Sequence, residues 1–120
     1  MPYSDTFNDH LAHPRYAGEI PDAHAVAEEV NPVCGDRIRL SLSVQDGFIS
    51  EARFLAYGCA PTLACGSALV ELINGRPVAE IRRLSRSDII HHLDGLPRQK
   101  YHAAALAIEV LATVLDRLNI

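Results

Sequence analysis

The sequence predicts an α+β fold in which helices pack on one face of a small antiparallel sheet. Alternating apolar and polar residues mark two neighbouring strands on either side of the dipeptide Asp46-Gly47. Apolar residues with helical spacing then mark helices through the second half of the chain. Strands that come first and helices that follow are typical of an α+β domain. With 120 residues the chain is long enough for one such domain, and we assign residues 1–120 to it.

The N-terminal part is predicted to contain one helix and one strand. Residues 4–13 are expected to form a short helix, because Ser4 or Asp5 can cap its start and Pro14 prevents its continuation. A loop follows, and within it a strand is expected near residues 23–30.

Residues 36–45 and 48–57 are predicted to pair as a β-hairpin. In the first segment apolar residues alternate with arginines and serines, and the second segment also places apolar residues on one face. The dipeptide Asp46-Gly47 suits the turn, because glycine adopts a positive φ at little steric cost. Charged residues are expected on the solvent face of this sheet, namely Arg37, Arg39, Glu51 and Arg53.

The loop length of this hairpin decides which residues face each other. A two-residue loop would place Cys34 opposite Cys59, but it would mix the apolar and polar faces. A three-residue loop over residues 46–48 pairs Leu40 with Phe54 and keeps the faces apart, so we expect this loop. In either register the two cysteines are expected to come close at the open end of the hairpin.

The second half of the chain is predicted to be helical. Pro61 suits the start of a helix that ends near Gly75. Two short helices are expected at residues 78–83 and 87–93, and the longest helix at residues 99–118. The apolar stripe of the longest helix consists of Ala103, Leu106, Ala107, Val110, Leu111, Val114 and Leu118.

Composition excludes several classes of function. Hydrophobic residues make up 48% of the chain and charged residues 22%, as in ordinary soluble domains. The net charge of −4 argues against nucleic acid as a partner, and we find no stretch that suits a membrane span or a signal peptide. Three cysteines are too few for a disulfide framework, so we expect a cytoplasmic protein whose cysteines bind metal or react. No hydrolase or phosphate-binding motif is present, and we expect a binding protein that is not an enzyme.

Four residues could form a metal site. Cys34, Asp36 and Cys59 are expected at the open end of the hairpin, and His102 in the first turn of the longest helix. Zinc and iron favour thiolate, imidazole and carboxylate ligands, and four ligands complete a tetrahedral site. The alternative interpretation is that the two cysteines are small buried residues without a ligand role.

Other potential ligands are interpreted as structural. Cys65 belongs to the apolar stripe of its helix and is expected to be buried, although a role as an additional ligand or sulfur carrier stays open. The remaining histidines are interpreted as solvated or capping residues: His10, His13, His24, His91 and His92.

Several motifs resemble those of the IscU/NifU-type iron–sulfur cluster assembly scaffolds, and the resemblance runs through the whole chain. The motifs are Tyr-Ser-Asp at residues 3–5, Asp-His at 9–10, Pro-Arg-x-x-Gly at 14–18, Asn-Pro-Val-Cys-Gly-Asp at 31–36, Ala-Arg-Phe at 52–54, Tyr-Gly-Cys at 57–59, and Leu-Pro, Lys and His at 96–102. The resemblance implies a three-stranded antiparallel sheet covered by helices. It also implies a transient [2Fe–2S] cluster, or iron, at Cys34, Asp36, Cys59 and His102, and zinc often occupies this site in the family.

The resemblance further implies the partners of the protein. Members of the family build the cluster with sulfur from a cysteine desulfurase and pass it to apo iron–sulfur proteins. A cluster can be bridged between two subunits, so a homodimer stays open. Residues 96–100 depart from the Leu-Pro-Pro-Val-Lys motif that an Hsp70-type chaperone recognises, so the resemblance does not extend to a dedicated chaperone.

The sequence departs from the family pattern at Ala103. The family has a third cysteine directly after the histidine, and that cysteine accepts persulfide and ligates metal. Alanine can do neither. Cys65 stands where the family usually has serine. This departure supports an alternative function, a zinc-binding member of the family that regulates a cysteine desulfurase without building clusters.

Overall fold

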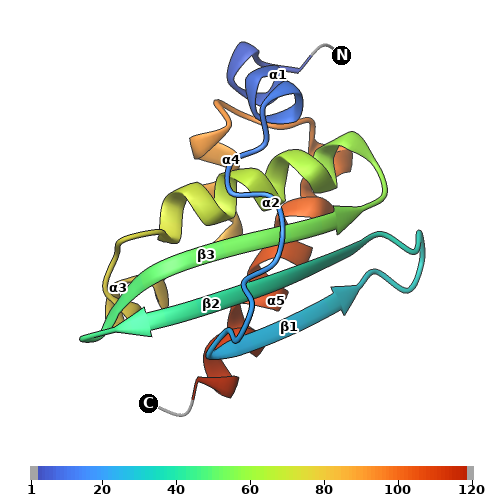
Figure 1. Ribbon diagram of the computed structural model, residues 1–120. Coiled ribbons are helices and arrows are strands. Elements are labelled where there is room, and N and C mark those ends of the chain that lie inside the picture. The colour runs from blue at the N-terminus through green and yellow to red at the C-terminus, as the bar shows by residue number, and fades with distance from the viewer. Residues whose placement is uncertain (1–2, 119–120) are drawn as a thin grey trace.

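The computed structural model describes residues 3–118, and in this part of the chain three antiparallel strands form one sheet in the order β1-β2-β3. The elements in chain order are α1 (Asp5–Ala12), β1 (Ala25–Val30), β2 (Arg37–Gln45), β3 (Phe48–Tyr57), α2 (Ala60–Ile73), α3 (Val78–Ile81), α4 (Arg86–His92), the 3-10 helix η1 (Arg98–Lys100) and α5 (Tyr101–Arg117). Helices α2 and α5 lie against the same face of the sheet (Figure 1). The predicted α+β fold and its three-stranded sheet are therefore confirmed. None of the helices in the described part is both long and apolar enough to cross a membrane.

The hairpin of β2 and β3 has the predicted register but not the predicted loop. Leu40 pairs with Phe54, as expected for the register that keeps apolar residues on one face. The loop, however, has two residues, Asp46 and Gly47, with φ values of 55° and 80°. Positive φ at both positions is typical of a tight type I′ hairpin turn. An irregularity between Ser43 and Val44 then shifts the register by one residue, which is the effect of a β-bulge.

The outer edge of β3 is closed by other segments of the chain. Asn74, at the end of α2, accepts a hydrogen bond from the Ala52 backbone N–H (2.8 Å) and donates one to the Ala52 carbonyl (3.1 Å). Further along the strand, Gly18 N–H donates to the Phe54 carbonyl at 2.8 Å. These contacts pair backbone groups that an edge strand would otherwise expose.

Helix α1 packs on the helical layer through its buried face. Ser4 caps the helix, because its Oγ accepts a hydrogen bond from the Phe7 backbone N–H at 2.9 Å. The same hydroxyl donates to the Leu93 carbonyl at the end of α4. Phe7 is fully buried and stacks on Tyr3, with ring centroids 3.9 Å apart. The predicted cap and helix are confirmed, and Ser4 and Phe7 attach the start of α1 to the rest of the domain.

Helix α5 begins two residues later than predicted, because residues 98–100 form the tighter helix η1 after Pro97. All seven residues of the predicted apolar stripe of α5 are buried. They pack against β1, β2 and α2, so α5 is fixed along its length. This packing places His102 in the first turn of α5, where the sequence predicted it.

Candidate metal centre

The loop that carries Cys34 is closed by hydrogen bonds around Asn31. The side-chain Oδ1 of Asn31 accepts a hydrogen bond from the backbone N–H of Val33 (2.9 Å). The backbone N–H of Asn31 donates a hydrogen bond to the Asp36 carbonyl (2.7 Å). Gly35 has a φ of +78° and donates its N–H to the Asn31 carbonyl. An asparagine side chain that bonds the backbone two residues later is a common way to fix a turn. The turn holds Cys34 on the surface, next to the start of β2.

Cys59 lies at the junction of β3 and α2. It occupies the N-cap position of α2, and Gly58 before it has a φ of +136°. A Cβ atom on Gly58 would lie 2.2 Å from Oδ1 of Asp36, so only glycine leaves room for this carboxylate. The strand ends, the chain turns and the thiol of Cys59 faces Asp36, all within three residues.

Asp36 is a buried residue whose carboxylate contacts Cys59 and Thr62 at the start of α2. Only 7% of the residue is exposed, and its Oδ2 accepts hydrogen bonds from Cys59 Sγ at 3.0 Å and from Thr62 Oγ1 at 2.8 Å. The hydrogen bond from the Cys59 thiol lowers the pKa of Asp36, and those from Thr62 and the Cys59 backbone add to this effect, while burial opposes it. Asp36 is therefore ionised at neutral pH. Its position at the N-terminus of α2 also favours a negative charge.

His102 joins Cys34 and Asp36 from the other side. One potential ligand atom from each of these three residues lies within 4.8 Å of the other two. The Nδ1–H of His102 donates to the Gln99 carbonyl at 3.2 Å, and a carbonyl can only accept. The neutral imidazole therefore has its lone pair on Nε2, the arrangement of a histidine whose outer hydrogen bond prepares it for a metal.

Cys59 is connected to the group of Cys34, Asp36 and His102 by its hydrogen bond to Asp36. Among the described residues, the group of ligand atoms within 4.8 Å contains Cys34, Asp36 and His102 but not Cys59. The paired strands stop at Arg37 and Tyr57, so the two cysteines do not face each other across the sheet. The structure thus brings all four predicted residues to one corner of the molecule, with Asp36 in contact with Cys59 and beside the other two.

The corner is open to solvent on two sides. A hollow of about 490 Å³ is lined by Glu28, Cys34, Gly35, Asp36, Arg37, Tyr57 and Gly58. A second one of about 300 Å³ is lined by Asn31, Val33, Cys34 and His102. Three apolar side chains near these hollows are exposed: Val33 by 94%, Tyr57 by 55% and Val30 by 43%. Exposed apolar side chains beside an open site are typical of surfaces that contact other proteins.

Ala103 and Cys65 are both fully buried. Ala103 contributes packing but no ligand atom, although it directly follows His102. Burial raises the pKa of the Cys65 thiol to about 12, with a smaller contribution from the charge of Cys59. Cys65 therefore stays protonated at neutral pH, and its predicted burial is confirmed.

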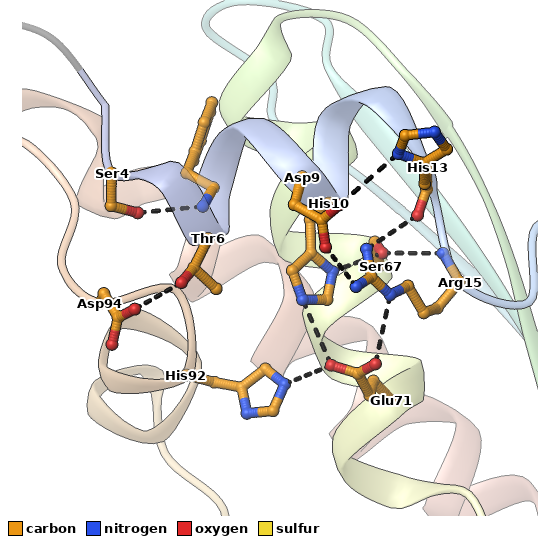
Figure 2. A network of polar contacts seen from close by, with 11 residues as sticks. Ser4, Thr6, Asp9, His10, His13, Arg15, Ser67, Glu71, His92 and Asp94 are labelled. Atoms are coloured by element: carbon orange, nitrogen blue, oxygen red, sulfur yellow. Dashed lines mark hydrogen bonds and ion pairs between the residues drawn. The ribbon is translucent and has the colours of Figure 1, made fainter.

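The interpretation of the other histidines was wrong for His10. Its ring is only 2% exposed, and its Nδ1 lies 2.7 Å from Ser67 Oγ (Figure 2). The sequence contained a signal, because His10 lies three residues after Phe7 and so shares the buried face of α1. His92 is half-buried and its Nε2 lies 2.6 Å from Glu71 Oε1, whereas His91 beside it on α4 is exposed.

A family profile described as NifU-like N terminal domain matches residues 2–118. This chain belongs to that family. The chain is 38% identical over 109 residues to the iron-sulfur cluster assembly scaffold protein IscU 1 of Archaeoglobus fulgidus, covering 91% of this chain and 71% of that protein. It is 33% identical over 119 residues to the IscU scaffold protein of Escherichia coli, covering 96% and 92%.

The fold agrees with a solved structure of the same family. The N-terminal part of a nitrogen-fixing NifU-like protein from Brucella abortus superposes with a TM-score of 0.80, covering 97% of this chain and 93% of that one. The two sequences are 15% identical, so this likeness supports the fold alone. Family and fold both confirm the resemblance seen in the sequence.

Proposed function

We propose that this protein is an iron–sulfur cluster assembly scaffold, which holds a nascent [2Fe–2S] cluster and transfers it to apo-proteins. The observation that carries the proposal is the corner where Cys34, Asp36, Cys59 and His102 meet in a chain of the NifU-like family. Relatives that align with nearly the whole chain are named as scaffold proteins. The cluster is cargo in this proposal, and the protein is a binding protein without turnover.

Each residue of the corner has a distinct chemical task in this proposal. The thiolates of Cys34 and Cys59 supply strong bonds to iron, and the Nε2 lone pair of His102 supplies a third. Asp36 offers a carboxylate oxygen, a harder donor that suits release of the cluster. This carboxylate accepts a hydrogen bond from the Cys59 thiol, and the thiol must lose its proton before its sulfur binds iron.

The open surface at the corner suits the partners that cluster assembly needs. A cysteine desulfurase would supply the sulfur. An external reductant would supply the electrons that convert this sulfur to sulfide. Both the donor and the accepting apo-protein must reach the exposed Cys34. The exposed side chains of Val33 and Tyr57 beside it would be covered while a partner is bound.

The alternative is a zinc-binding family member that regulates a desulfurase without building clusters. Its support is Ala103, because the chain lacks a thiol directly after His102. Relatives named as scaffolds favour cluster assembly. Anaerobic reconstitution with iron, cysteine, a desulfurase and a reductant separates the two functions, since a scaffold develops the visible absorption of a [2Fe–2S] centre and the regulator stays colourless.

Cysteine variants test which residues hold the metal or cluster. We expect Cys34→Ala and Cys59→Ala to lose the iron or zinc that is bound at the corner, because each removes a thiolate ligand. Cys65→Ala is the matched control and should keep most of the metal, since Cys65 is buried outside the corner. Metal analysis of the three purified variants measures this. Full retention of metal in Cys59→Ala would refute the proposed ligand set.

A further inference from the structure

His10, Glu71 and His92 come together from three different helices and share no residue with the candidate metal centre. One potential ligand atom from each lies within 4.8 Å of the other two. The Oε1 atom of Glu71 lies 3.2 Å from His10 Nε2 and 2.6 Å from His92 Nε2. Figure 2 shows both imidazole rings directed at this carboxylate, one from α1 and one from α4. Two imidazoles and one carboxylate are a ligand set that zinc uses in proteins.

Hydrogen bonds from outside already orient two of these three side chains. Ser67 Oγ lies 2.7 Å from His10 Nδ1, which turns Nε2 of the ring toward Glu71. Arg15 Nε donates to the other oxygen of the carboxylate, Oε2, at 3.2 Å, so Oε1 is left to the two histidines (Figure 2). Such outer hydrogen bonds are characteristic of metal ligands, because they fix ring orientation and carboxylate position.

The charges around the cluster favour a cation. Glu71 and Asp9 are carboxylates, Arg15 is the guanidinium that contacts both, and the ring of the exposed His13 faces Asp9. With neutral imidazoles, the two carboxylates outweigh the single guanidinium. Burial and the charge of Arg15 lower the pKa of His10, so this ring is neutral at pH 7. When its proton is on Nδ1, beside Ser67 Oγ, the lone pair on Nε2 can bind a metal. Burial alone would raise the pKa of Glu71, but the hydrogen bond from His92 and the charge of Arg15 lower it, so the carboxylate stays ionised.

We propose that His10, Glu71 and His92 form a second metal site, which binds one divalent transition-metal ion of the Zn²⁺ class. Nε2 of each histidine and Oε1 of Glu71 are the ligand atoms, and water takes the remaining position. His10 is 2% exposed, Glu71 36% and His92 30%, so the ion is reached from the side of Glu71 and His92. The site is independent of the proposed cluster function.

This site links the N-terminal helix to the rest of the domain. His10 is on α1, Glu71 on α2 and His92 on α4. A metal bound to all three would hold α1 on the helical layer, in addition to the contacts of Phe7 and Ser4. Because the ion binds only when the three helices are docked, it stabilises the folded state.

Co²⁺ is the probe that distinguishes this site from the cysteine-containing corner. The tag-free variant Cys34→Ala/Cys59→Ala removes the thiolates of the corner. We expect this variant to bind one equivalent of Co²⁺, with visible absorption but without a sulfur-to-cobalt charge-transfer band. Introducing His92→Gln should weaken this binding more than about 100-fold, since losing a direct ligand costs more than losing an outer hydrogen bond. His91→Gln is the matched control, because the neighbouring exposed residue should not alter binding.

A second measurement covers the case in which the double cysteine variant does not fold. In the otherwise unaltered chain, Zn²⁺ should raise the midpoint of thermal unfolding, and His92→Gln should lose part of that rise while His91→Gln retains it. Circular dichroism of the metal-free variants checks that each is folded. Equal Co²⁺ affinity in His92→Gln and His91→Gln, or no Co²⁺ bound by the folded double variant, would overturn the proposal and leave the cluster as an ion-pair network.

Discussion

Asp36 connects Cys59 to the rest of the candidate metal centre. Its carboxylate accepts hydrogen bonds from the Cys59 thiol and the Thr62 hydroxyl. It also lies beside Cys34 and His102. The folded chain itself makes these contacts, and they fix the position of the carboxylate. The ordering cost of the ligand set is therefore partly met by folding, an advantage for any binding site.

Gly58→Ala tests whether the position of Asp36 controls metal binding. The added Cβ would lie 2.2 Å from Asp36 Oδ1, so the carboxylate must move away from Cys59 and Thr62. We expect the affinity of the corner with Cys34, Asp36, Cys59 and His102 for Zn²⁺ to fall by at least about tenfold, as for loss of an ordering contact in a metal site. Backbone strain at a φ of +136° should also lower the free energy of unfolding by about 1–3 kcal/mol.

Gly18→Ala is the control that separates strain from displacement. Gly18 has a similar φ of +126°, but nothing lies within 4 Å of a Cβ added there. It should lose a comparable free energy of unfolding and keep its affinity for Zn²⁺. Urea unfolding and competition with a chelator measure the two quantities. If both variants lost affinity equally, strain and not the position of Asp36 would be responsible.

Single residues also show how far the sequence could predict the sites. Cys34, Asp36 and Cys59 could be predicted as a group, because a hairpin brings its two ends together whatever its loop length. The sequence also predicts His102 as a ligand, because this residue lies at the start of a strongly periodic helix. The group of His10, Glu71 and His92 could not be predicted, because three helices separated along the chain meet only through packing.

The hairpin of β2 and β3 also combines features that the sequence predicts with features that it does not. Alternation fixed which residues of β2 and β3 share a face, since the apolar set must point to the core. The alternation could not predict the backbone conformation of the turn, in which Asp46 and Gly47 both have positive φ and a bulge near Ser43 restores the register. The competing loop lengths differ by one residue, and a bulge makes both compatible with the pattern.

Helix α1 is expected to respond to pH through His10. Burial and the charge of Arg15 lower the pKa of this imidazole below its value of 6.5 in an unfolded chain. As the pH falls below about 6.5, the unfolded state takes up a proton before the folded state does. The contribution of neutral His10 to stability is thus complete above about pH 6.5 and is lost as the pH falls through the folded-state value. Glu71, His92 and Asp9 are the other titratable groups whose charges act on His10.

Urea unfolding of the metal-free protein between about pH 5 and 7 measures this effect. The unfolding free energy should decline toward the acid end, and His10→Gln should reduce the slope. His13→Gln is the control, since that ring is 79% exposed, and it should keep the slope of the unaltered chain. Equal slopes in all three proteins would show that His10 does not cause the pH dependence.

The two candidate sites lie in different parts of the molecule. The corner with Cys34 lies where loops at the end of the sheet meet the start of α5, and it is open to partners. The group around Glu71 lies among α1, α2 and α4, where it can act on the docking of the N-terminal helix. The α+β class and the helical layer could be predicted from periodicity. The mutual placement of the helices could not, because it depends on packing of side chains distant in sequence.

The iron and acid-labile sulfide content of the protein, purified without air and before any reconstitution, tests the central claim most directly. The proposed scaffold should contain iron and sulfide in equal amounts, despite Ala103, and should lose both in Cys59→Ala. Zinc without sulfide in the unaltered protein would contradict cluster assembly and favour the regulatory alternative.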